Sequence, residues 1–341
     1  MEKIKININN KNLGIQLLRF FLCLWVVIYH CSNIKKGHRK YFYRGFHVPT
    51  FFMLSFYYFY PILSGRKVDK IIIKFQRLLI PYILWPTFIL LLNNFLINFF
   101  HFGQFNNIIP LKNLYFQIII GSPLHIVFWF HFNLIFLSLF FLLISFLFPK
   151  KLLILIYFIG ITSLIFHVSQ INYIFFNRFR NKFRNNLGSI IELIPLAALG
   201  VCYGSINLLQ KVKHYPKYLK IIFFIFIIIL FKYDIFIKMD GFRYPNVFLN
   251  IAASTFLILF FGSINFENRN KIYTFLNTVT NFTGGIYYLH PVVQGYISIC
   301  LSLSNRKGTY FFAFIIYIIC YGICLLGNKS MKNKKLKYLF I

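Results

Sequence analysis

Residues 13–30, LGIQLLRFFLCLWVVIYH, form an apolar run long enough to cross a bilayer as one helix. The run carries two groups that a lipid-facing helix would reject, Arg19 in its first half and His30 at its end. An arginine near the bilayer centre costs roughly 2.5–3.5 kcal/mol, so it usually faces a protein interior or a water-filled cavity. From Arg19 to His30 the helix makes about three turns plus 20° and rises about 16 Å. The two side chains therefore share a face without touching, which predicts a long ligand.

The composition is that of an integral membrane protein. Of 341 residues, 59% are hydrophobic and 21% aromatic, and the mean hydropathy is +0.68. Lys and Arg total 37 against 6 acidic residues, in short clusters between apolar runs. This pattern favours contact with anionic lipid headgroups and control of topology over nucleic-acid binding. The six cysteines lack the spacing of a metal site, so we expect no metal.

The apolar runs predict an all-α transmembrane bundle that forms a single domain over residues 1–341. The ten predicted membrane helices lie at about 13–34, 46–64, 79–102, 123–148, 152–170, 189–208, 219–237, 244–264, 282–303 and 310–327. Ten crossings place both termini on one side. The positive-inside rule makes that side cytoplasmic, because the inner segments hold 21 Lys and Arg and the outer segments 15.

Several connecting segments have patterns of their own. Leu111–Ile120 and Glu267–Asn281 are amphipathic and favour short helices at the membrane interface. The outer loops 35–45 and 177–186 are strongly basic, against the positive-inside rule. Each can hold an anionic glycan or lipid headgroup, or can be an ordinary solvated loop.

The chemistry-bearing residues are mostly histidines, and histidine is the usual general acid or base near neutral pH. Under this topology seven of the nine lie in the outer half or on outer loops: His30, His38, His47, His101, His125, His131 and His167. His214 lies inside, and His290 lies within the ninth helix. Glu192 can orient a histidine or neutralise an arginine, and is equally explained as a helix N-terminal acid. The chain has no GxSxG, HExxH, P-loop or DxD motif.

Five blocks follow one another along the chain: LLRFFLCLWVVIYH (17–30), HVPTFFMLSFYYF (47–59), IIIKFQRLLIPYILW (71–85), VFWFHFNLIFL (127–137) and GGIYYLHPVV (284–293). Their order and content resemble the acyltransferase 3 family, integral-membrane enzymes that acylate, usually O-acetylate, bacterial cell-surface glycans. The first and last blocks are the more specific. The chain departs from the family at Gln16, where an aspartate is common, and at Ser55-Phe56, where Ser-Gly is usual.

The resemblance implies transfer of an acyl group, normally acetyl from acetyl-CoA, to a hydroxyl of a lipid-linked or exported glycan. It implies no permanently bound cofactor and a bacterial plasma-membrane location. Arg19, helped by Lys74 and Arg77, would hold the CoA phosphates, because arginine suits bidentate phosphate contacts.

His30 would then act near the thioester, as a general base or as a transient acyl carrier. His290 is a second catalytic candidate, although a histidine before Pro291 can instead reorganise the backbone hydrogen bonds that the proline frees. Glu192 can supply the acid that Gln16 does not. The alternative from another class is a non-catalytic exporter or transporter of glycans or lipids.

Overall fold

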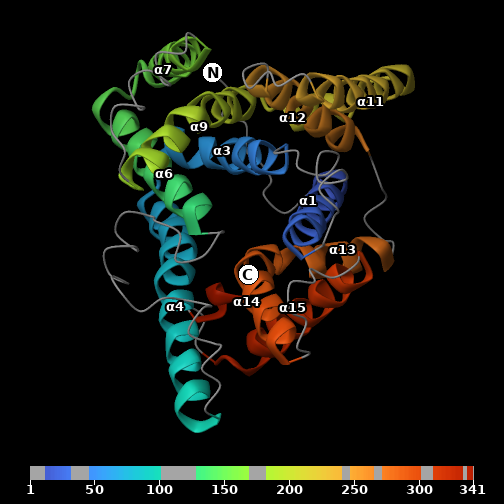
Figure 1. The fold of residues 1–341 in the computed structure, drawn as a ribbon. Coiled ribbons are helices and arrows are strands. Elements are labelled where there is room, and N and C mark those ends of the chain that lie inside the picture. Colours follow the sequence, from blue (N-terminus) through green and yellow to red (C-terminus); the bar gives the residue numbers. More distant parts are fainter. Residues whose placement is uncertain are drawn as a thin grey trace.

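The computed structural model describes residues 12–31, 46–100, 128–168, 182–239, 246–264, 271–300, 310–332 and 336–340. Within these ranges the regular secondary structure is entirely helical, and short turns join some of the helices, which confirms the all-α prediction (Figure 1). The elements are α1 Leu13–Cys31, α3 His47–Gly65, α4 Val68–Phe100, α6 Phe128–Leu147, α7 Leu152–Val168, α9 Lys182–Ser205, α10 Leu208–Val212, α11 Lys217–Met239, α12 Asn246–Ser263, α13 Lys271–Asn281, α14 Thr283–Cys300, α15 Tyr310–Ser330 and the 3-10 helix η2 Leu336–Leu339.

Each of the ten predicted membrane segments overlaps a long helix: α1, α3, α4, α6, α7, α9, α11, α12, α14 and α15. Three stretches are long and apolar enough to count clearly as membrane spans: Leu13–His30, Trp129–Leu147 and Phe311–Ser330. The predicted interfacial segment 267–281 overlaps α13. The other predicted interfacial segment, Leu111–Ile120, and the basic loop 35–45 lie outside the described residues.

Helix α4 begins earlier than the sequence predicts. Residues 68–78, which precede the predicted helix at 79–102, are the first turns of a helix of 33 residues. Asp69 lies in the first turn, where a carboxylate complements the helix dipole. Lysine and arginine can extend the helix beyond the apolar run, because both have high helix propensity. The hydropathy pattern therefore predicts where the apolar run begins, but the helix itself begins earlier in the chain.

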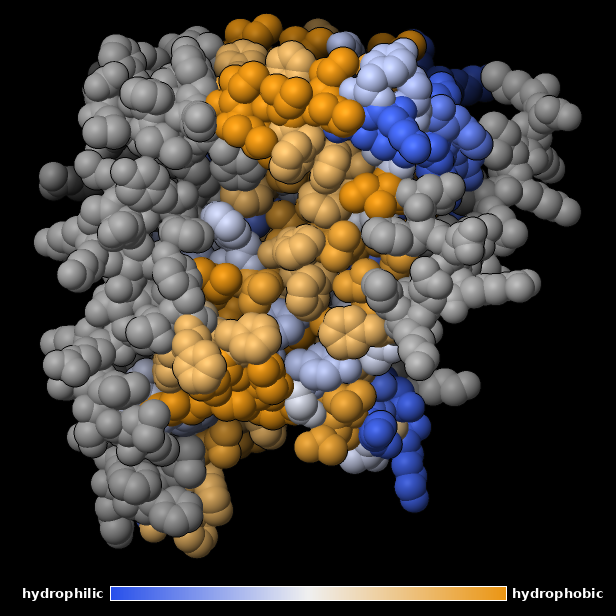
Figure 2. All heavy atoms as spheres, turned by 90° about the vertical axis from the view of Figure 1, so that its right-hand side faces the viewer, coloured by the Kyte–Doolittle hydropathy of each residue, from blue (hydrophilic) through white to orange (hydrophobic). Residues whose placement is uncertain are grey.

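The outward surface of the bundle is apolar. Helix α11 exposes a run of large apolar side chains: Ile221, Ile222, Phe224, Ile225, Phe226, Ile228 and Ile229. On the face drawn in Figure 2, hydrophobic side chains form a broad band, and hydrophilic ones gather at two places along one edge. Such a continuous apolar surface is unfavourable in water and suits contact with lipid. The exposed side chains therefore agree with a membrane protein.

Helices α3 and α9 pack closely through two glycines. A Cβ atom on Gly204 would lie 2.7 Å from the carbonyl oxygen of Tyr57, and one on Gly200 would collide with the carbonyl oxygen of Met53. Gly200 and Gly204 form a GxxxG pattern, which lets two membrane helices approach at backbone distance. This contact fixes α3, the helix that carries His47 and Phe59.

Helix α1 is held at its first turn. The side-chain oxygen of Asn12 accepts a hydrogen bond of 3.2 Å from the Ile15 amide, as an N-cap does. The Asn12 side-chain amide donates to the carbonyl of Gly262 in α12 at 2.8 Å. Helix α1 also packs against α13, α14 and α15, so that it lies among the C-terminal helices (Figure 1). This placement brings α1 and α14, the two helices with the most specific motifs, side by side.

Candidate functional site

The first half of α1 carries a polar cluster around Arg19. One terminal nitrogen of Arg19 donates to the Thr283 hydroxyl of α14 at 3.0 Å, and the other donates to the Gln16 side-chain oxygen at 3.4 Å. The Thr280 hydroxyl lies 2.6 Å from the same Gln16 oxygen. Both partners of Arg19 are neutral oxygens, so they satisfy two of its donors without cancelling its charge. Arg19 is thus oriented and still able to attract an anion.

Gln16, where the resemblance led us to expect an aspartate, is an acceptor for Arg19. Its side chain is buried. The hydrogen bond from Thr280 ties Gln16 to α13, and the bond from Arg19 ties it to the next turn of α1. The departure from the family pattern therefore removes a negative charge and keeps a hydrogen-bond partner.

The C-terminal end of α1 brings two histidines together. The rings of His30 and His290 lie 5.3 Å apart between centroids, at 35° to each other. Nδ1 of His290 lies 3.2 Å from the Ile286 carbonyl oxygen. A carbonyl only accepts, so Nδ1 carries the hydrogen, and Nε2 of the neutral ring carries the lone pair. The pair thus contains a nitrogen that can take a proton.

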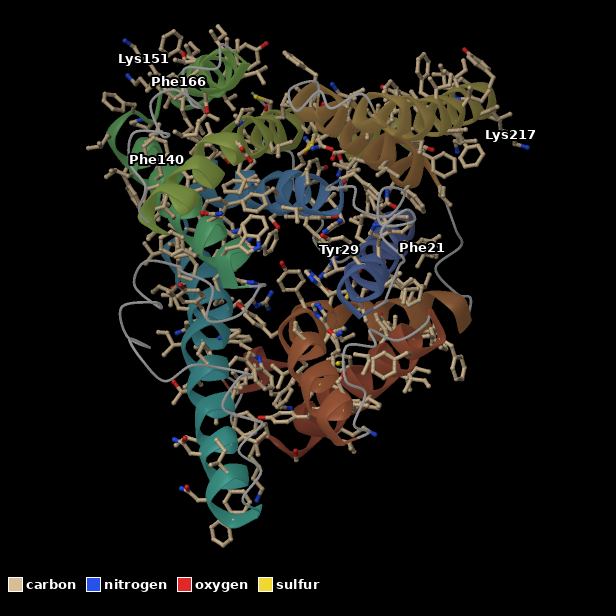
Figure 3. All side chains as sticks on the ribbon, in the orientation of Figure 1. Phe21, Tyr29, Phe140, Lys151, Phe166 and Lys217 are labelled. Carbon is tan, nitrogen blue, oxygen red and sulfur yellow. The ribbon has the colours of Figure 1, made fainter. Side chains whose placement is uncertain are left out.

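Aromatic side chains surround this histidine pair. The ring of Tyr29 lies 4.9 Å from that of His30 and 6.2 Å from that of His47 on α3. Figure 3 shows Tyr29 on the side of α1 that faces α6 and α14, with Phe21 on the opposite side. The ring of Tyr287 lies 6.0 Å from that of His290. His30 thus lies between Tyr29 and His290, and Tyr29 links it to His47, at the end of α1 away from Arg19.

His131 is a buried polar residue that the sequence does not single out. The centroid of its ring lies 4.2 Å from that of Tyr288 and 5.7 Å from that of Tyr287, so it packs against α14, the helix that carries His290. Within the described part of the chain its Nδ1 has no hydrogen-bond partner. A histidine in the aromatic block 127–137 is a signal that sequence reasoning could have used.

The two basic residues expected at the donor end lie on α4 in different surroundings. The Lys74 amino group lies over the Phe59 ring, 4.1 Å from its centroid. The Arg77 guanidinium lies 5.4 Å from the centroid of the Tyr338 ring. Phe59 follows Tyr58, which is close enough to Arg19 for an electrostatic interaction.

Glu192 lies on α9 and is exposed. No hydrogen bond or ion pair among the described residues joins it to Arg19 or to a histidine. The same part of the chain contains no group of three His, Cys, Asp or Glu side chains that could hold a metal ion. His38, His101 and His125 lie outside the described residues, as does the side chain of His167.

A bundle of apolar helices with an oriented arginine and a histidine pair between two of them defines an integral membrane protein with a polar internal site. Residues 12–328 match the acyltransferase 3 family, described as an acyltransferase domain, and the chain belongs to this family. Searches of curated proteins and of solved structures give no match. Family membership supports an acyltransferase activity.

Proposed function

We propose that the protein transfers an acyl group, acetyl in the first instance, from acyl-CoA to a hydroxyl of a lipid-linked or exported cell-surface polysaccharide. The observation that carries the proposal is the contact between His30 and His290 at 5.3 Å. These residues come from the first and last of the family-like blocks, which are far apart in the sequence. A contact between them is what a shared catalytic role requires.

The spacing along α1 suits CoA as the donor. Arg19 of α1 donates a hydrogen bond to Thr283 of α14. The His30 ring of α1 contacts the ring of His290, about two turns after Thr283 on α14. From Arg19 to His30 the axis of α1 rises by about 16 Å. CoA is anionic at its nucleotide end and extends through a long arm to the thioester. Phosphates at Arg19 would therefore leave the thioester within reach of the histidines.

The chemical step is a direct transfer. The acceptor hydroxyl gives its proton to an imidazole nitrogen while its oxygen attacks the thioester carbonyl. The carbon–sulfur bond breaks, the new ester forms on the glycan, and the thiolate takes the proton to become CoA thiol. His30 is partly exposed and His290 is fully buried. His30 is therefore the better base for an incoming hydroxyl. His290 packs against its ring from the buried side.

The donor end would use positive charge from two helices. The charge of Arg19 is not cancelled, because its hydrogen-bond partners are neutral, and the Lys74 amino group reaches α3 from α4. Arg77 is exposed one turn further along α4. Guanidinium groups bind phosphate through parallel N–H donors, whereas an ammonium acts as a point charge. Together the three would attract the nucleotide end of CoA.

The membrane arrangement is part of the proposal. Ten crossings with cytoplasmic termini, in a bacterial plasma membrane, put Arg19 toward the cytoplasm and His30 toward the outside. Acyl-CoA would then enter from the inside and the glycan would meet the histidines from the outside. The single helix α1 would connect the two compartments.

The test compares surface glycans from cells that produce the wild type, His30→Ala or Phe21→Ala. Phe21 is a matched control because it lies on the same helix and is exposed on the opposite side (Figure 3). Mass spectrometry should show acyl groups with the wild type and Phe21→Ala, and none with His30→Ala. Unchanged acylation in His30→Ala would refute the catalytic role. Loss of glycan export with normal acylation would favour the exporter.

A further inference from the structure

The segment 336–340 lies beyond the part of the chain that matches the family, which ends at residue 328. It forms the short helix η2 followed by Phe340, and it packs against α4 (Figure 1). The indole N–H of Trp85 donates to the Leu339 carbonyl at 2.9 Å. The Phe340 ring meets the Trp85 ring edge to face, with 5.8 Å between centroids. The segment is thus anchored to the middle of α4.

Two glycines on other helices make room for Phe340. A Cβ atom on Gly285 of α14 would lie 2.8 Å from the Phe340 carbonyl oxygen. A Cβ atom on Gly327 of α15 would lie 2.8 Å from ring atom Cε2 of Phe340, and closer still to two others. Phe340 is itself buried. The segment therefore occupies a seat formed by α4, α14 and α15.

Seated in this way, the segment touches the donor end at Arg77. The Tyr338 ring lies 5.4 Å from the central carbon of the Arg77 guanidinium, within the range of a cation–π contact. The aromatic ring carries no formal negative charge, so this contact leaves the guanidinium charge uncancelled. The ring can thus hold the group without competing for an anion. Gly285 is also two residues from Thr283, the partner of Arg19.

We propose that Tyr338 is a positioning residue for the donor: it holds the Arg77 guanidinium so that its N–H edge meets a phosphate of CoA. The inference rests on the proposed function. Arg77 is exposed, and a free arginine side chain loses rotamer entropy when it binds. A ring that already orients it removes part of that loss. Trp85, Gly285 and Gly327 serve this role indirectly, because they seat the segment that carries Tyr338.

The experiment measures KM and kcat of the purified full chain with two donors, acetyl-CoA and S-acetylpantetheine, which lacks the nucleotide phosphates. Tyr338→Ala should raise KM for acetyl-CoA about three- to tenfold and leave kcat within about twofold. Its KM for S-acetylpantetheine should not change. Tyr338→Phe keeps the ring and should restore the wild-type KM. A merely structural role would change both donors alike.

A matched pair of glycine variants on α15 tests whether the packing of Phe340 matters for donor binding. Gly327→Ala should displace Phe340 and raise KM for acetyl-CoA as Tyr338→Ala does. Gly322→Ala adds a Cβ where nothing lies within 4 Å and should behave as wild type. A wild type that transfers acetyl, with a Tyr338→Ala variant whose KM is unchanged or lower, overturns the positioning role alone. A wild type that transfers nothing from either donor overturns the proposed function and this inference with it.

Discussion

Replacing Gln16 by leucine should destabilise the protein by about 2 kcal/mol. The Thr280 hydroxyl lies 2.6 Å from the Gln16 oxygen, and a neutral hydrogen bond of this kind contributes about 1 kcal/mol. The Arg19 bond to the same oxygen is long, at 3.4 Å, so we assign it about 1 kcal/mol, below the usual range for charged groups. In the Gln16→Leu protein the Thr280 hydroxyl can still donate to the Leu276 carbonyl oxygen, 2.7 Å away. It is therefore not left without a hydrogen bond, and the loss of stability needs no further contribution from it. The sum corresponds to roughly a 30-fold change in the unfolding equilibrium.

The assay is the free energy of unfolding of the purified protein in mixed micelles. Gln16→Glu is the matched control, because it keeps acceptor oxygens at the same place and should retain the stability that Gln16→Leu loses. A cycle with Thr280→Val should give a coupling energy of about 1 kcal/mol with Gln16→Leu. A Gln16→Leu protein within about 0.5 kcal/mol of wild type would refute the assignment of these hydrogen bonds.

Two further predictions concern helix packing. Gly200→Ala should destabilise by about 1–3 kcal/mol, because its Cβ collides with the Met53 carbonyl, whereas Gly322→Ala should not destabilise. Equal stability of these two variants in the same unfolding assay would contradict the close α3–α9 contact. Ser145→Ala should cost about 1 kcal/mol, because the buried Ser145 hydroxyl donates at 2.7 Å to the carbonyl of Leu63, in the last turn of α3. A Ser145→Ala protein as stable as the wild type would count against this hydrogen bond.

The sequence predicts the helices well because membrane helices need long apolar runs. The paired faces of Arg19 and His30 also follow from the sequence, because both lie on one helix and its period is regular. The early start of α4 could not be predicted in this way, because Lys74 and Arg77 interrupt the apolar run and still lie on a helix. Periodicity within one helix is local information. It says nothing about which helices meet.

The partners of the site residues depend on contacts between distant parts of the chain. Thr283, which accepts from Arg19, is 264 residues away, and a threonine at a helix start has an ordinary local explanation. The contact between His30 and His290 likewise joins residues that are far apart in the sequence, so no local pattern predicts it. The place of Tyr338 could not be predicted either, because it lies in a lysine-rich segment that hydropathy assigns to the aqueous side. One signal was available: the GxxxG pattern at Gly200 indicates a close helix contact.

The central claim is that α1 holds the donor near Arg19 and performs the chemistry near His30. It is tested most directly by steady-state transfer of labelled acetyl from acetyl-CoA to glycan by purified Arg19→Gln and His30→Gln proteins. The account predicts that Arg19→Gln mainly raises KM for acetyl-CoA, and that His30→Gln lowers kcat at least 100-fold, within the range of general base catalysis of about 10²–10⁴. A His30→Gln protein that turns over at the wild-type kcat would contradict it.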